Sequence, residues 1–114
     1  MQTEDIPLIQ KTYDLYKTFY QLSPNFPKKD RFGIGQRCEN YLLTLIEGVI
    51  KASKSNKTQK MTILHEVSVK LDMLRIFIRL LKDLLIIDLK KYTLLQEKLH
   101  EVGKMLGGWI KSLN

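Results

Sequence analysis

The sequence predicts an all-α protein, an up-down-up-down bundle of four helices that forms a single domain over residues 1–114. Apolar residues recur at intervals of three and four along nearly the whole chain, and only short polar or proline-containing segments interrupt them. Long helices with short connections favour antiparallel neighbours. The expected helices cover residues 6–22, 28–53, 59–86 and 89–112.

Three breaks separate these helices. Residues 23–27 contain two prolines, and residues 53–58 form a polar cluster rich in serine and lysine. The third break is less obvious, because the apolar run 84–87 leads directly into Asp88, which is placed to cap a helix that begins at Leu89. Each break is short enough to join antiparallel neighbours.

Each helix has an apolar row that can face the core. The rows expected to face the core are Ile6, Ile9, Tyr13, Tyr16 and Tyr20 in the first helix; Cys38, Leu42, Leu45, Ile46 and Val49 in the second; Leu64, Val67, Leu71, Leu74, Ile78, Leu81 and Leu85 in the third; and Tyr92, Leu95, Leu99, Val102, Leu106, Trp109 and Leu113 in the fourth.

Two helices also carry a second apolar row on the opposite side, which one bundle core cannot bury as well. These rows predict contacts between subunits of a homo-oligomer. The alternative is that both helices are central in an irregular bundle. The second rows are Leu8, Leu15, Phe19 and Leu22 in the first helix, and Val69, Met73, Ile76, Leu80 and Leu84 in the third.

Three glycines interrupt the last helix, at Gly103, Gly107 and Gly108. Glycine inside a helix costs about 1 kcal/mol relative to alanine, so each one calls for a compensating close approach of a neighbouring group. The C-terminal segment is therefore expected to be a docking surface.

Composition narrows the class of function. One cysteine, Cys38, cannot form an internal disulfide, and with only His65 and His100 beside it a four-ligand metal site is not expected. Residues 1–5 carry acids where a secretory signal carries bases, and no apolar run reaches the 18 residues of a membrane span, so cytoplasmic residence without membrane binding is expected. The net charge of +7 favours a polyanionic partner, the alternative being a role in solubility.

The chain has fifteen lysines and four arginines, so the arginine positions are candidates for bidentate contacts to phosphate. Arg75, Arg79 and Lys82 share a narrow sector of the third helix. They predict a phosphate-contacting ridge, unless they pair with Asp72, Asp83 or an acid of another subunit.

A second basic group follows the proline-containing connection and comprises Lys28, Lys29, Arg31 and Arg37. Cations near a helix start oppose the helix dipole, so local stability does not explain them and an anion site is a reasonable interpretation. A solvated charge run is the alternative for the two lysines. Lys104 lies on a mixed surface of the fourth helix and is a weaker candidate.

No catalytic arrangement is evident. Neither histidine has a paired serine or cysteine nucleophile, and no Glu-x-x-His ligand set is present. Cys38 lies on an apolar face and is interpreted as a core residue. We therefore expect no enzyme activity, no cofactor and no small-molecule substrate.

Four segments, residues 11–15, 26–37, 74–80 and 102–110, strongly resemble the accessory variability determinant proteins of diversity-generating retroelements. The closing sequence Gly-Lys-Met-Leu-Gly-Gly-Trp and the spacing of Arg75 and Arg79 are its most specific parts. This family belongs to a wider four-helix-bundle group that includes the ribosomal-RNA intervening-sequence proteins.

The resemblance implies a bacterial or phage-encoded, non-enzymatic, basic homopentamer of barrel shape, which binds the retroelement's reverse transcriptase and RNA or DNA during mutagenic retrohoming. Carried over by position, the family's basic residues are Arg31, Arg37, Arg75, Arg79 and Lys104. Lys28 and Lys29 depart from the arginine and serine pair expected there. The alternative function is a stand-alone bundle that binds a protein partner without nucleic acid.

Overall fold

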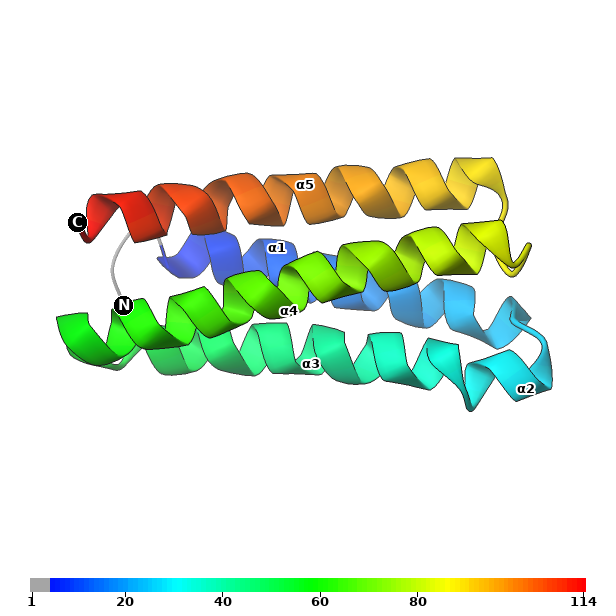
Figure 1. The fold of residues 1–114 in the computed structure, drawn as a ribbon, viewed down its shortest axis with the longest axis horizontal. Helices are drawn as coiled ribbons and strands as arrows, with labels where there is room; N and C mark the ends of the chain where they lie inside the picture. Colours follow the sequence, from blue (N-terminus) through cyan, green and yellow to red (C-terminus); the bar gives the residue numbers. More distant parts are fainter. Residues whose placement is uncertain (1–4) are drawn as a thin grey trace.

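The computed structural model confirms the predicted four-helix bundle (Figure 1). It describes the backbone of residues 5–114 and the side chains of residues 7–114, so the expectations for residues 1–5 and for the side chain of Ile6 lie outside the described residues. The elements are α1 (Asp5–Leu22), the 3-10 turn η1 (Ser23–Asn25), α2 (Lys28–Arg31), α3 (Ile34–Ser53), α4 (Lys57–Asp83) and α5 (Leu89–Ser112).

The bundle is elongated, 43 × 22 × 19 Å, and its long helices run antiparallel in chain order. The helix α1 packs mainly against α3 and α5, and α4 packs against the same two helices. Therefore α1 and α4 lie diagonally opposite each other, and their outer faces look away from each other. One end of the bundle carries η1, α2 and the turn between α4 and α5 (Figure 1); we call it the α2 end.

Side-chain caps begin the last two helices. The Asn56 side chain accepts a hydrogen bond of 2.9 Å from the backbone N–H of Gln59, so α4 begins two residues before the expected position. The Asp88 carboxylate accepts one of 2.8 Å from the backbone N–H of Lys91, which confirms the predicted cap of α5.

The single helix predicted over residues 28–53 is wrong, because the chain breaks between α2 and α3. Phe32 (ψ 0°) and Gly33 (ψ −111°) leave the helical conformation there. A Cβ on Gly33 would lie 2.9 Å from the Lys29 carbonyl oxygen, and one on Gly35 would lie 2.8 Å from that of Asp30. These glycines allow the backbone to fold tightly at the break, so α3 starts late.

The predicted core rows are confirmed in α3, α4 and α5, apart from Ile46 within the row of α3 and the terminal residues of the other two rows. Ile46, Tyr92 and Leu113 are only partly buried. The residues that fill the core from these helices are Cys38, Leu42, Leu45, Val49, Ala52, Leu64, Val67, Leu71, Leu74, Ile78, Leu81, Leu95, Leu99, Val102, Leu106 and Trp109.

The predicted core face of α1 is wrong, because the helix is turned the other way. Leu8, Leu15 and Phe19 are buried, whereas Tyr13 and Tyr20 are 56% and 59% exposed. Both rows have helical spacing, so periodicity could not choose between them. The aliphatic and phenylalanine row can be buried without leaving tyrosine hydroxyls unsatisfied, and this favours the observed orientation.

The end of α4 also differs from prediction, because the helix stops at Asp83 instead of residue 86. The backbone N–H of Ile86 donates to the Leu81 carbonyl at 2.9 Å and that of Leu85 donates to Lys82 at 3.0 Å, which is a Schellman motif. Leu85 occupies its left-handed position with φ 61° and is 89% exposed, so its assignment to the core row is wrong. Leucine there costs about 1–2 kcal/mol of conformational energy.

The second apolar row of α4 lies outside the core, as the sequence predicted. Val69, Met73, Ile76, Leu80 and Leu84 are all exposed on the outer face of this helix. Within the described residues, the core is complete without them. The chain alone therefore leaves this row uncovered.

Glycine allows α4 to approach both of its neighbours closely. A Cβ on Gly48 of α3 would overlap the Val67 side chain of α4, and a Cβ on Gly103 of α5 would overlap the Arg75 guanidinium. The prediction of a close approach is thus confirmed at Gly103. Apart from the adjacent residues and backbone of α5 itself, no atom of the described residues lies within 4 Å of a Cβ built on Gly107 or Gly108, so no other helix makes such an approach there.

We expect Gly48→Ala and Gly107→Ala to change stability in opposite directions. The added methyl at position 48 meets the stiff, buried Val67, so the free energy of unfolding should fall by about 1–3 kcal/mol. At position 107 the added methyl meets no other helix, and alanine favours the helical conformation more than glycine does. The free energy of unfolding should therefore rise by about 0.5–1 kcal/mol. Urea unfolding followed by circular dichroism measures both, and equal changes would contradict the α3–α4 contact.

A second pair of variants tests the orientation of α1. Leu15→Ala removes a buried side chain and should lower the free energy of unfolding by about 2–5 kcal/mol. Tyr13→Ala changes an exposed residue on the same helix and should lie within about 0.5 kcal/mol of the unmodified protein at concentrations where it is monomeric. A larger loss of unfolding free energy for Tyr13→Ala would indicate that the tyrosine row faces the core.

Candidate nucleic-acid interface

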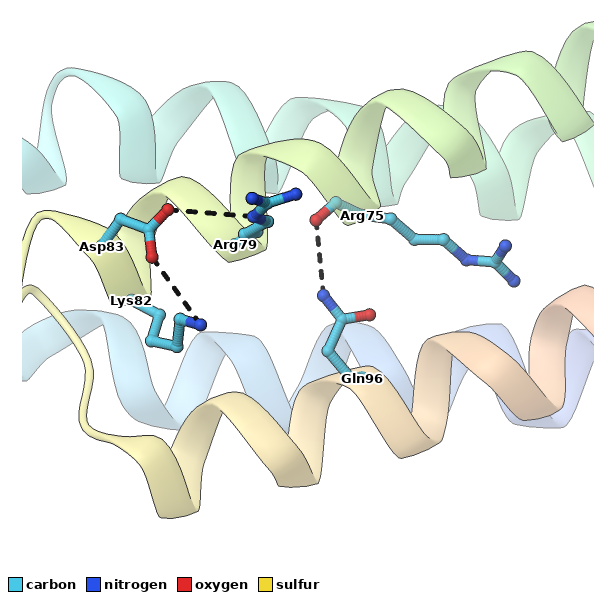
Figure 2. A network of polar contacts seen from close by, with 5 residues as sticks. All are labelled: Arg75, Arg79, Lys82, Asp83 and Gln96. Carbon is cyan, nitrogen blue, oxygen red and sulfur yellow. Dashed lines mark hydrogen bonds and ion pairs between the residues drawn. The ribbon is translucent and has the colours of Figure 1, made fainter.

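Arg79 and Lys82 share one carboxylate near the end of α4 (Figure 2). The Nε of Arg79 lies 3.8 Å from Asp83 Oδ2, and the Nζ of Lys82 lies 3.6 Å from Asp83 Oδ1. The Arg79 side chain is 66% exposed, so this ion pair contributes little to stability. One carboxylate does not neutralise two cations, and the group keeps a net positive charge.

Arg75 does not extend the same ridge. Its side chain points away from Arg79 and along the bundle (Figure 2), and its guanidinium covers Gly103 of α5. Its Nη1 lies 3.6 Å from the Asp72 carboxylate. Arg75 therefore pairs with Asp72 and Arg79 with Asp83, as in the alternative interpretation of these arginines.

The backbone of Arg75 also joins α4 to α5. Gln96 Nε2 donates a hydrogen bond of 3.3 Å to the Arg75 carbonyl oxygen (Figure 2). Arg75 therefore has a packing role between the two helices as well as accessible N–H groups at its 38% exposed side chain. A change at this residue would alter the helix contact and the surface charge together.

The second basic group lies on α2 and the start of α3. Lys28, Lys29 and Arg37 are exposed. The Arg31 guanidinium carbon lies 5.7 Å from the centre of the Phe32 ring, and the Arg31 Nε is buried with no hydrogen-bond partner among the described residues. Arg31 is the member of this group that is held in place by its surroundings.

The fold brings most of the candidate residues to the α2 end (Figure 1). Arg37 lies beside Phe77 of α4, which links the second basic group to the helix that carries Arg79. Lys104 is separate, because it lies fifteen residues into α5 and hence about 22 Å along that helix from the α2 end. The structure therefore groups Lys28, Lys29, Arg31, Arg37, Arg79 and Lys82 at one end and leaves Lys104 outside.

Several carboxylates at this end already have partners. Asp83 pairs with two cations, and Asp88 accepts the capping hydrogen bond from Lys91. Glu39 accepts a hydrogen bond of 2.7 Å from the Tyr16 hydroxyl, and this bond, followed by desolvation, raises the pKa of Tyr16 to about 12. Lys90 and Lys91, in the first turn of α5, add further positive charge to this end beyond that of the candidate residues. An anionic ligand suits this end of the bundle.

The two histidines and the cysteine lie apart from one another in the described residues. His65 and His100 are exposed on different helices, and no three His, Cys, Asp or Glu side chains in residues 7–114 come together as a metal site. Burial raises the pKa of the Cys38 thiol to about 12, so it is a poor nucleophile. None of the helices described here is long and apolar enough to span a membrane.

Comparison with known families identifies a match. A family model described as bAvd-like matches residues 7–113, nearly the whole chain. This match confirms the resemblance to accessory variability determinant proteins seen in the four sequence segments. A search of curated proteins found no match.

We expect Cys38 to resist thiol reagents while the protein is folded. At pH 8 a pKa of about 12 leaves about 10⁻⁴ of the thiol ionised, and the side chain is fully buried. Dithionitrobenzoate should therefore label the native protein only at the rate of unfolding, and label it at once in 6 M guanidinium chloride. Rapid native labelling would contradict the packing of α3.

Proposed function

We propose, because the chain belongs to the bAvd-like family, that it is a non-enzymatic accessory protein of a diversity-generating retroelement. In this role it binds the reverse transcriptase of the element together with RNA or DNA, and it supports mutagenic retrohoming as an assembly platform. The family is an accessory, non-catalytic one. Cytoplasmic residence follows from this role.

The cation-rich α2 end is the observation that carries the nucleic-acid part of the proposal. Three helices contribute cations to this end, namely Arg31, Arg37, Arg79 and Lys82. The carboxylates of Asp83 and Asp88 there already have partners within the chain. Arginine presents several N–H donors in a plane, which suits phosphate oxygens. Lys28 and Lys29 extend the same surface.

The uncovered row on α4 supports self-association. Val69, Ile76 and Leu84 are each more than half exposed, and contiguous apolar surface of this kind is typical of subunit contacts. We propose that this row is buried in a homo-oligomer, and the family membership favours a pentamer. The same row also favours the second candidate function, a bundle that binds only a protein partner.

Two double variants test the phosphate surface. Arg37→Ala with Arg79→Ala removes two exposed cations at the α2 end, whereas Lys54→Ala with Lys57→Ala removes two exposed lysines at the opposite end as a matched control. Binding of template RNA is measured between 50 and 200 mM salt, because phosphate contacts release counterions. We expect the slope of log affinity against log salt to fall by about 1.4 for the first pair on single-stranded RNA, and to change little for the control.

Light scattering of the protein alone, with the reverse transcriptase of the proposed retroelement and with template RNA separates the two candidate functions. The retroelement function requires an oligomer that binds both. Binding of the polymerase without RNA at any salt concentration would favour the protein-interaction module. Equal RNA affinities of the two double variants would show that the α2 end is not the surface that contacts phosphates.

A further inference from the structure

The turn between α4 and α5 displays leucines instead of burying them. Leu85 and Leu89 are 89% and 68% exposed, although Ile87 in the same turn is buried. The turn therefore has an inner side that closes the core and an outer side that is apolar and open. It lies at the α2 end of the bundle (Figure 1). We call these two exposed residues, Leu85 and Leu89, the leucine knob.

The conformation of Leu85 makes this exposure unexpected. It occupies the left-handed position of the Schellman motif, with φ 61°, where glycine or asparagine is usual. A leucine there is strained by its Cβ, and its side chain is almost completely exposed. The stability of this chain alone thus does not account for leucine at position 85.

The neighbouring lysines also occupy positions where they do not favour the stability of this chain. Lys90 and Lys91 lie in the first turn of α5, where positive charge opposes the helix dipole. Neither forms an ion pair among the described residues. The nearby Asp83 and Asp88 are occupied by Arg79 and Lys82 and by the cap of α5. Apolar side chains and uncompensated cations therefore lie together on one turn.

We propose that the leucine knob inserts into an apolar pocket of a protein partner whose rim carries carboxylates that pair with Lys90 and Lys91. Phosphates of a nucleic acid would satisfy the lysines but would leave the leucines in water, so a protein is the better match. The inference rests on the proposed function, under which this partner is the reverse transcriptase.

Substitution of Leu85 separates stability from binding. Leu85→Gly and Leu85→Asn relieve the strained backbone, so the melting temperature should rise by about 4 °C or more. The same variants should bind the purified reverse transcriptase about tenfold more weakly, because the apolar contact is lost. Leu85→Met should retain the affinity, and Leu43→Ala, at an exposed leucine of α3, is the matched control that should leave it unchanged.

A second substitution tests the charged part of the contact. Lys90→Glu with Lys91→Glu reverses two charges while making the first turn of α5 more favourable for the helix dipole. Binding to the reverse transcriptase at low salt should weaken about tenfold, although the melting temperature does not fall. Unchanged affinity would show that carboxylates of the partner do not meet these lysines.

Every other outcome overturns the inference in a recognisable way. If the unmodified protein does not bind the reverse transcriptase, the proposed function and the inference fail together. If it binds and the Leu85 variants bind equally well, only the inference fails. Loss of the oligomer in these variants would assign the knob to a subunit contact. Binding to phosphatidylserine vesicles that depends on the knob would assign the knob to a membrane contact. A melting temperature that does not rise in the Leu85 variants would contradict the backbone strain on which the inference rests.

Discussion

The close packing of α4 between α3 and α5 is the constraint on which the rest of the structure depends. Gly48 admits Val67 on one side, and Gly103 admits the Arg75 side chain on the other. These contacts fix the rotation of α4 about its axis, so its row from Leu64 to Leu81 faces the core. The same rotation necessarily turns the second apolar row of this helix outward.

The two outer faces of the bundle are consequently different in chemistry. The outer face of α4 is aliphatic, whereas that of α1 carries tyrosines, because the aliphatic residues of α1 are used in the core. Since α1 and α4 lie on a diagonal, these faces are on opposite sides of the molecule. A bundle of this kind can present distinct surfaces to distinct partners without any change in its fold.

The α2 end concentrates features that do not favour the stability of an isolated bundle. A leucine occupies a left-handed backbone position, two lysines oppose the dipole of α5, and the Arg31 Nε is buried without a partner among the described residues. Each is destabilising or neutral by itself. Their occurrence at one end is consistent with a surface shaped by binding, and it agrees with the accessory role proposed for a bAvd-like protein.

The sequence by itself determined the fold class, the cap at Asp88 and the core rows of α3, α4 and α5, because these depend on local spacing and capping chemistry. It also identified the basic residues and, through four sequence segments, the family. Only the tertiary structure decided which face of α1 is buried, since Leu15 and Tyr13 have equally helical spacing. The direction of Arg75 depends on Gly103 in another helix, and the outward position of Leu85 depends on where α4 stops. Periodicity describes one helix at a time, whereas these three outcomes are set by contacts between helices and by the backbone at their ends.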